Sequence, residues 1–346
     1  MKAALILGAG FSKNSGIPIQ SEIPGMLVTN GYEGEFEAAV SEVLKKFMEE
    51  VFNYDGSQNM PNLDDILTCL DISTNSGHHL GIKYSPVHLR TIRRLLVYRV
   101  FTILEKSFIP SKDVSTLVHN LSKTYETSYI VLNWDTVLEK YIRMVLPGAG
   151  VDYCSGGYDW ENDGLSKDKV KVIKVHGSCN WLYCDNCRAL FHDQNDSFSL
   201  LEKGGFQNID FELFDELRKV SGNEKILSGK KCRICGNIVS SHIATFSYRK
   251  SFRANSFPRI WEKAEEVLAD SDRWIFIGYS LPEADYEFKH LLKIAELKLR
   301  HMRKKDLLID VVLLNSSSTP QKYKGFFGKR INVLCNDGIK GYLSYI

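Results

Sequence analysis

Five apolar runs in this chain each lead into a polar or glycine-containing segment, and helical patterns separate most of them. The runs are Ala3–Gly8, Tyr129–Leu132, Val170–Val175, Trp274–Ile277 and Leu307–Leu314. Short runs that are apolar on both faces are typical of buried strands in a parallel sheet. The sequence therefore predicts an α/β fold, in which a Rossmann-like, mostly parallel sheet carries helices on both faces. Ile331–Leu334 is predicted to add an edge strand.

The segment between the first two runs is predicted to be a helical insertion of about residues 20–125. Glu35–Phe52 and His88–Phe108 carry apolar residues at helical spacing. The polar stretches Asn53–Asn62 and Ser73–Ser85 are predicted to be loops. Further helices are predicted directly after Asp135, at Arg259–Ala269 and at Asp285–Met302.

Polar residues and glycines follow the predicted strands, at the edge where parallel sheets bind ligands. Glycines allow the backbone to approach a phosphate, and the free N–H groups of a helix start favour an anion. Each motif alone has an ordinary explanation, such as a tight turn, a helix cap or a structural histidine. Their occurrence at five strand ends predicts one ligand site. Its residues are Gly8, Ala9, Gly10, Phe11, Ser12, Asn133, Asp135, His176, Gly278, Ser280 and Asn315.

Two Cys-x-x-Cys pairs predict a small zinc-binding module at residues 179–245. The pairs are Cys184 with Cys187 and Cys232 with Cys235, and four thiolates suit a tetrahedral structural zinc site. A single pair would also suit redox chemistry, but two pairs favour metal. The long gap between them predicts an insertion at about His192–Lys230. The other cysteines are interpreted as buried or incidental: Cys69, Cys154, Cys179 and Cys335.

The order of these motifs resembles the sirtuin family over nearly the whole chain. The sirtuin opening is resembled by Gly8-Ala9-Gly10-Phe11-Ser12 followed by Gly16-Ile17-Pro18. The usual dinucleotide fingerprint has a third glycine where this chain has Lys13, but the sirtuin turn does not need that glycine. Four further motifs resemble those of sirtuins: Asn133-x-Asp135, His176-Gly177, Gly278-x-Ser280 and Asn315. The four-cysteine module also lies where sirtuins carry their zinc module. The resemblance is strongest to the divergent bacterial branch used in antiphage defence.

The resemblance implies roles for these residues in cleaving NAD between nicotinamide and ribose. Asn133 would position a water or the carboxamide near the ribose C1′, and Asp135 would contact the nicotinamide-ribose end. His176 would act as a base toward a ribose hydroxyl, or polarise it. The remaining strand-end residues would bind the rest of NAD. Residues 1–178 and 246–346 would then form the NAD-binding domain.

The acceptor of the ADP-ribose group distinguishes two enzyme classes. Sirtuin deacylases hold a peptide between two segments. Where the family has a phenylalanine–arginine pair this chain has Ile19-Gln20, and the second segment, Ala244–Lys250, also departs from the family pattern. The cofactor side is kept and the peptide side is not, which favours water and predicts an NAD hydrolase acting in defence. A protein deacylase and a non-catalytic NAD or ADP-ribose sensor remain the alternatives.

Composition limits the other partners. The net charge of +2 gives no global argument for nucleic acid, and the basic run Lys289–Lys305 is interpreted as a solvated helix face. No apolar stretch reaches membrane-spanning length and the N-terminus is unlike a signal peptide, so a cytoplasmic protein is expected. A hydrolase of this kind must be restrained, and the resemblance implies a homo-oligomer or a partner ATPase of the translocase type.

Overall fold

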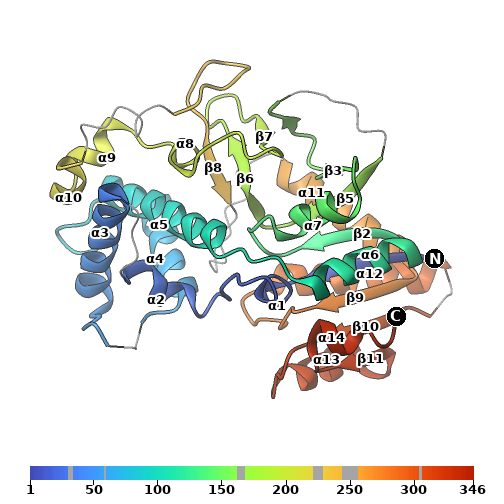
Figure 1. Ribbon diagram of the computed structural model, residues 1–346. Coiled ribbons are helices and arrows are strands. Elements are labelled where there is room, and N and C mark those ends of the chain that lie inside the picture. Colours follow the sequence, from blue (N-terminus) through green and yellow to red (C-terminus); the bar gives the residue numbers. More distant parts are fainter. Residues whose placement is uncertain (30–33, 58–59, 162–167, 221–228, 244–255, 304–305) are drawn as a thin grey trace.

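The computed structural model describes residues 1–29, 34–57, 60–161, 168–220, 229–243, 256–303 and 306–346. A seven-stranded sheet forms its centre (Figure 1), and all neighbouring strands in it run parallel. The α/β fold expected from the sequence is therefore confirmed. The strands, in spatial order, are β11 (Ile331–Cys335), β10 (Leu308–Val312), β9 (Arg273–Ile277), β1 (Lys2–Leu7), β2 (Glu126–Val131), β5 (Lys169–Lys174) and β3 (Gly150–Asp152).

The register of the central strands brings their carboxyl ends to one edge. Leu7 of β1 lies beside Val131 of β2 on one side and Ile277 of β9 on the other. Because these strands end level with one another, the residues that follow them meet at a common rim. The six strands expected from apolar runs all occur, and the edge position of β11 is confirmed. The short strand β3 was not foreseen.

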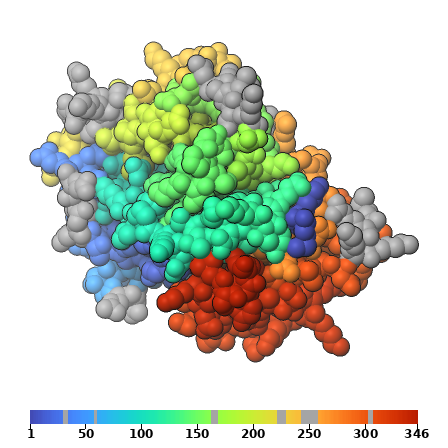
Figure 2. Space-filling model, turned by 45° about the vertical axis from the view of Figure 1, so that its right-hand side comes forward, coloured from blue at the N-terminus to red at the C-terminus, as the bar shows by residue number. Residues whose placement is uncertain are grey.

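Helices bury both faces of this sheet, as the almost complete burial of β1 requires. In α6, Val114, Leu117, Val118 and Leu121 form the buried face at helical spacing. The C-terminal helix α14 packs against α6 (Figure 2). The helices around the sheet are α6 (Lys112–Thr124), α7 (Val137–Val145), α11 (Ser256–Asp270), α12 (Tyr286–Arg303), α13 (Thr319–Phe327) with the 3-10 turn η2 (Gly328–Arg330), and α14 (Gly338–Tyr342).

The helical insertion lies beside the sheet (Figure 1). It contains α2 (Ile23–Val28), α3 (Glu35–Phe52), α4 (Leu63–Ser76) and α5 (Pro86–Lys106), after the short α1 (Ala9–Lys13). The bounds of α3 are those predicted. The loop predicted at Ser73–Ser85 is wrong in its first residues, because α4 continues to Ser76. Gly77 ends it in the left-handed conformation, at φ 71°.

A second, four-stranded sheet carries the cysteine pairs. Its order is β4 (Tyr158–Asp159), β7 (Leu190–His192), β6 (Gly177–Tyr183) and β8 (Ser240–Ile243). Strand β4 of this sheet comes before both cysteine pairs in the chain. The segment between the cysteine pairs forms α8 (Leu200–Gly204), α9 (Asn208–Glu212) and α10 (Asp215–Arg218), of which α8 packs on α5 and α10 on α3. Helix α8 also packs on β8, so these helices connect the second sheet to the helical insertion.

The described part of the basic run lies on α12, and the described helices also bear on the question of a membrane span. Along the basic run, the exposed Lys298 forms an ion pair with Glu265, whereas Lys293 pairs with the buried Glu296 and donates to the Phe326 carbonyl oxygen, so that it packs against α13 and not on a solvated face. Lys304 and Lys305 lie outside the described residues. A membrane-spanning helix is absent from the described ranges, since none there combines the necessary length and apolarity.

Candidate functional site

The glycines after β1 and β9 pack backbone against backbone. The Gly10 N–H donates to the Gly278 carbonyl oxygen at 2.9 Å, and the Gly8 N–H donates to the Ile277 carbonyl oxygen at 3.0 Å. A Cβ on Gly278 would lie 2.2 Å from the Phe11 nitrogen, and Gly278 has a φ of +64°. No side chain fits such a contact, so close packing of the two turns itself requires these glycines.

A hydrogen-bonded cluster of three polar side chains closes the adjoining end of β2. Asn133 Nδ2 donates to the Gly8 carbonyl oxygen and to Ser12 Oγ, both at 2.9 Å. Ser12 Oγ donates to Asp135 Oδ1 at 3.0 Å. The Gly8 carbonyl can only accept, so the amide nitrogen must face it, and both amide hydrogens have partners. Asn133 Oδ1 is therefore the atom available to a ligand.

Burial shifts the pKa of the Asp135 carboxyl group. Its side chain is almost fully buried, and this burial raises the pKa of the carboxyl above its usual value, although nearby Lys174 opposes the shift. Asp135 Oδ1 also accepts from the Val137 N–H at 3.0 Å, while the N-cap position of α7 is the next residue, Thr136. The fully buried Lys174 donates to the Asp135 carbonyl oxygen and to Glu139 Oε1, the latter at 3.1 Å.

Two adjoining hollows open at this edge, and together we call them the strand-end cavity. Their volumes are about 100 Å³ and 570 Å³. Both hollows touch Ala9, Gln20, Leu63, Gly278, Tyr279 and Ser280. Gly8, Ser12, Asn133 and Asp135 line the smaller hollow, while Gly10 and Lys13 line the larger one. The strand ends thus bring most of the predicted site residues to one cavity.

His176 lies behind the cavity wall. Its side chain is fully buried, its Nε2 lies 3.5 Å from Asp285 Oδ1, and it does not line either hollow. Tyr279, which does line them, donates from its hydroxyl to Asp285 Oδ2 at 2.9 Å. Asp285 therefore links the histidine after β5 to the loop after β9.

Two other predicted residues also stand apart from the cavity. Phe11 is buried in the core below the turn. Asn315 is exposed, with a φ of +46°, and its neighbours Leu314 and Ser316 line the larger hollow. At the position that departs from the sirtuin pattern, Gln20 lines both hollows and donates to Asp64. The second departing segment, Ala244–Lys250, lies outside the described residues.

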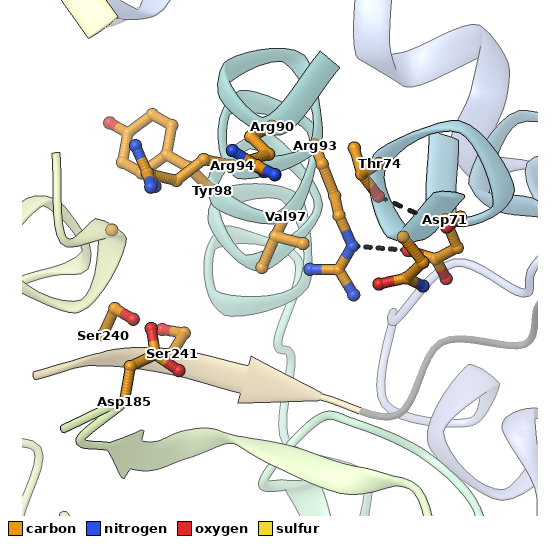
Figure 3. Close-up of a pocket in the computed structure, with 12 residues that line it drawn as sticks. Asp71, Thr74, Arg90, Arg93, Arg94, Val97, Tyr98, Asp185, Ser240 and Ser241 are labelled. Atoms are coloured by element: carbon orange, nitrogen blue, oxygen red, sulfur yellow. Dashed lines mark hydrogen bonds and ion pairs between the residues drawn. The ribbon is translucent and has the colours of Figure 1, made fainter. Parts of the chain in front are cut away.

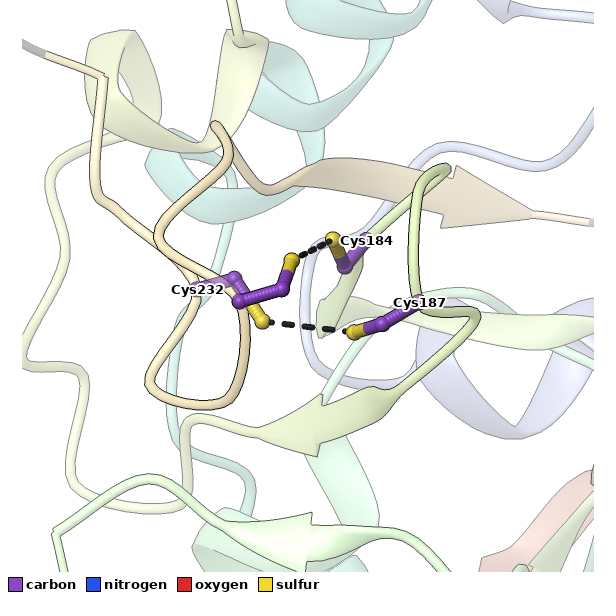
Figure 4. Close-up of side chains that lie close together, drawn as sticks. Cys184, Cys187 and Cys232 are labelled. Carbon is purple, nitrogen blue, oxygen red and sulfur yellow. Dashed lines mark hydrogen bonds between the residues drawn. The ribbon is translucent and has the colours of Figure 1, made fainter.

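The four predicted cysteine ligands form one cluster (Figure 4). Their sulfur atoms all lie within 4.8 Å of one another. Cys184 and Cys235 Sγ are 3.4 Å apart, and Cys187 and Cys232 Sγ are 3.5 Å apart. Four thiolates at such distances fit tetrahedral zinc, so this cluster could hold the metal. A small core that includes Leu182, Phe191 and Val239 packs around it.

Comparisons with known proteins give matches among solved structures alone. No family model and no curated protein matches the chain. A Sir2 complex with p53 peptide and NAD+ is 15% identical with a TM-score of 0.45, over 99% of this chain and 91% of that one. A mutant Sir2 homologue in complex with ADP-ribose is 14% identical with a TM-score of 0.45, over 99% and 88%. Similarity at this level says nothing of activity.

Sequence reasoning missed residues that support the site from behind. Lys174 and Glu139 form a buried ion pair under Asp135, and Asp285 lies beside His176. In the sequence, Lys174 interrupts an apolar strand end two residues before His176. A lysine at such a position indicates a buried charge that needs a partner. Charged residues are rarely fully buried without a partner.

Proposed function

We propose that this chain hydrolyses NAD to nicotinamide and ADP-ribose. The observation that carries the proposal is the Ser12–Asn133–Asp135 cluster, which lies in the wall of a cavity edged by the Gly8–Gly10 turn and Gly278. The cavity lies at the carboxyl ends of parallel strands, where such sheets bind dinucleotides. The larger hollow, of about 570 Å³, has the size of a small-molecule site.

In this proposal Asn133 orients the attacking water. Both amide hydrogens of Asn133 are held by the protein, so Oδ1 accepts a hydrogen bond from the water. The water oxygen attacks the ribose C1′, the bond to nicotinamide breaks, and nicotinamide leaves with the electron pair. We assign the removal of the water proton to Asp135, because its carboxyl group lines the smaller hollow together with Asn133.

We assign His176 a positioning role instead of contact with the water. It lies beyond the cavity wall and acts through Asp285 on Tyr279, which holds the loop carrying Gly278 and Ser280. This assignment departs from the role that the sirtuin resemblance implies for this histidine. Phe11 and Asn315 are proposed to shape the cavity from its floor and its rim.

Further parts of the proposal rest on the sequence resemblance. They are NAD depletion during antiphage defence, cytoplasmic location, and restraint by a homo-oligomer or by a translocase-type ATPase. Measurement of cellular NAD after phage infection, in cells with wild-type protein or Asn133→Ala, tests the first. Size-exclusion chromatography with light scattering tests assembly.

The experiment that tests the enzymatic activity is product analysis. Purified protein is incubated with NAD, with and without an acetyl-lysine peptide, and nicotinamide, ADP-ribose and O-acetyl-ADP-ribose are separated. Hydrolysis predicts ADP-ribose in the absence of peptide. Acetyl-ADP-ribose that forms with peptide, while NAD alone stays intact, would establish the deacylase instead. Tight NAD binding without any product would establish the sensor.

A further inference from the structure

A second cavity, of about 350 Å³, lies between the helical insertion and the second sheet (Figure 3). Arg90, Arg93 and Arg94 of α5 line one side. Asp185, of the first cysteine pair's turn, and Ser240 of β8 line the other. None of its lining residues belongs to the strand-end cavity. We call it the arginine pocket.

The three arginines share one face of α5. Positions 90, 93 and 94 are separated by three and four residues, which places their side chains together on a helix. Tyr98, which follows Arg94 by four residues, also lines the pocket and adds an aromatic wall. The sequence carries this signal as Arg90-x-x-Arg93-Arg94, which the strand-end site leaves unused.

Two buried aspartates hold two of the guanidinium groups in place. Arg93 Nε donates to Asp71 Oδ1 at 2.6 Å, and Arg94 Nη1 donates to Asp210 Oδ1 at 2.6 Å. Each aspartate side chain is at most 3% exposed. A guanidinium has five N–H donors, so each arginine retains donors beyond this pair. In Figure 3 the terminal nitrogens of Arg93 lie over the open space between α5 and β8.

Arg90 supplies a cation that no described residue neutralises. It is exposed and forms no ion pair with any residue that the structure describes. Two carboxylates line the pocket among the described residues: Asp71, which is paired with Arg93, and the exposed Asp185 on the opposite side. Asp210 is paired with Arg94. Prearranged guanidinium donors and one unpaired cation are the means by which proteins recognise phosphate.

We propose that the arginine pocket binds the phosphate groups of a small phosphorylated molecule. Its volume suits a mononucleotide. The ligand would accept hydrogen bonds from the α5 arginines on one side and from Ser240 on the other. It would therefore join the helical insertion to the second sheet. This site does not depend on NAD hydrolysis.

Binding of inorganic pyrophosphate, AMP and ATP, measured by calorimetry at constant ionic strength, tests the proposal. We expect at least one probe to bind wild-type protein, and Arg90→Glu to weaken it by roughly tenfold or more, since a hydrogen bond between charged groups contributes about 1.5–3 kcal/mol. Arg90 has no ion partner among the described residues and is exposed, so the variant should fold, as its thermal unfolding will show. Which probe binds most tightly distinguishes a bare phosphate site from a nucleotide site.

The matched control is Arg218→Glu, the same charge reversal at an exposed arginine that is paired with the exposed Asp215. It should bind the probes as wild type does. Absence of binding of all three probes to wild-type protein at millimolar concentration would overturn the proposal. Equal affinity in wild type and Arg90→Glu would also overturn it, because the probes would then occupy another site, such as the strand-end cavity.

Discussion

Asn133 ties the end of β2 to the turn after β1, through its Nδ2 hydrogen bond of 2.9 Å to the Gly8 carbonyl oxygen. The same nitrogen reaches Ser12, so the turn fixes both hydrogens of the amide. The side chain consequently presents its oxygen to the strand-end cavity in one orientation. A residue that must orient water needs this kind of fixed geometry.

Replacement of Gly278 by alanine should destabilise the fold severely. Its Cβ would lie 2.2 Å from the Phe11 nitrogen, and its φ of +64° is unfavourable for alanine. We expect a loss of roughly 3 kcal/mol or more in the free energy of unfolding, measured by urea denaturation. Gly325→Ala is the control, because Gly325 lies in α13 and a Cβ added there would meet open space. A similar stability for both variants would contradict the packing described here.

Removal of zinc should loosen the second sheet. Purified protein should contain about one zinc per chain, and a strong chelator should lower the thermal unfolding midpoint by more than about 5 °C. Cys232→Ser should lose the metal, while Cys69→Ser, outside the cluster, should retain it. Metal-free protein that unfolds at the same temperature with and without chelator would refute a structural zinc site.

Asp135 should make wild-type stability fall with rising pH relative to Asp135→Asn. Burial raises its folded pKa above the unfolded value, so the folded state holds the proton more tightly. Its ionisation therefore costs stability as pH rises from the unfolded pKa to the raised folded pKa. The variant's free energy of unfolding, minus that of wild type, should increase through this window and then level off. Urea denaturation at a series of pH values measures it.

Glu22→Gln gives the opposite sign and serves as the control for this pH series. The hydrogen bond from Lys13 lowers the pKa of Glu22, so its carboxylate adds stability above the unfolded pKa and loses it as pH falls. The effect should be small, because both side chains are more than 40% exposed. Parallel pH curves for Asp135→Asn and wild type would show that burial does not shift the Asp135 pKa.

Lys174→Met should destabilise the protein by roughly 3 kcal/mol or more, because it leaves the buried Glu139 without its cation. The double variant Lys174→Met with Glu139→Gln should recover part of this loss, since no buried charge is then left unpaired. Denaturation of wild type, both single variants and the double variant gives the coupling energy. Strictly additive losses would mean that the two residues do not depend on each other.

The sequence predicts those elements whose pattern is local. Helix α3 and the six main strands follow from apolar periodicity within one segment. The four cysteines were recognisable because zinc knuckles have a fixed short spacing. The two-residue strand β4 was not, since it exists only through its pairing with β7, about thirty positions away.

The sequence does not reveal which polar residues of the site are buried away from the cavity. His176 follows a strand, as a catalytic residue would. Its side chain nevertheless lies behind the cavity wall, beside Asp285, which comes more than one hundred positions later in the sequence. The paired arginines of α5 likewise depend on Asp71 and on Asp210, the latter brought over by α9. Such contacts arise from tertiary packing and leave no periodic trace.

The most direct test of the account follows oxygen from labelled water into the product. Protein and NAD are mixed in ¹⁸O-water for a single turnover, and the products are analysed by mass spectrometry for wild type and Asn133→Ala. We predict ADP-ribose carrying one ¹⁸O, unlabelled nicotinamide, and a rate at least about 100-fold lower for Asn133→Ala. No ADP-ribose from NAD alone, or equal rates for the two proteins, would contradict the proposal that Asn133 directs water to NAD.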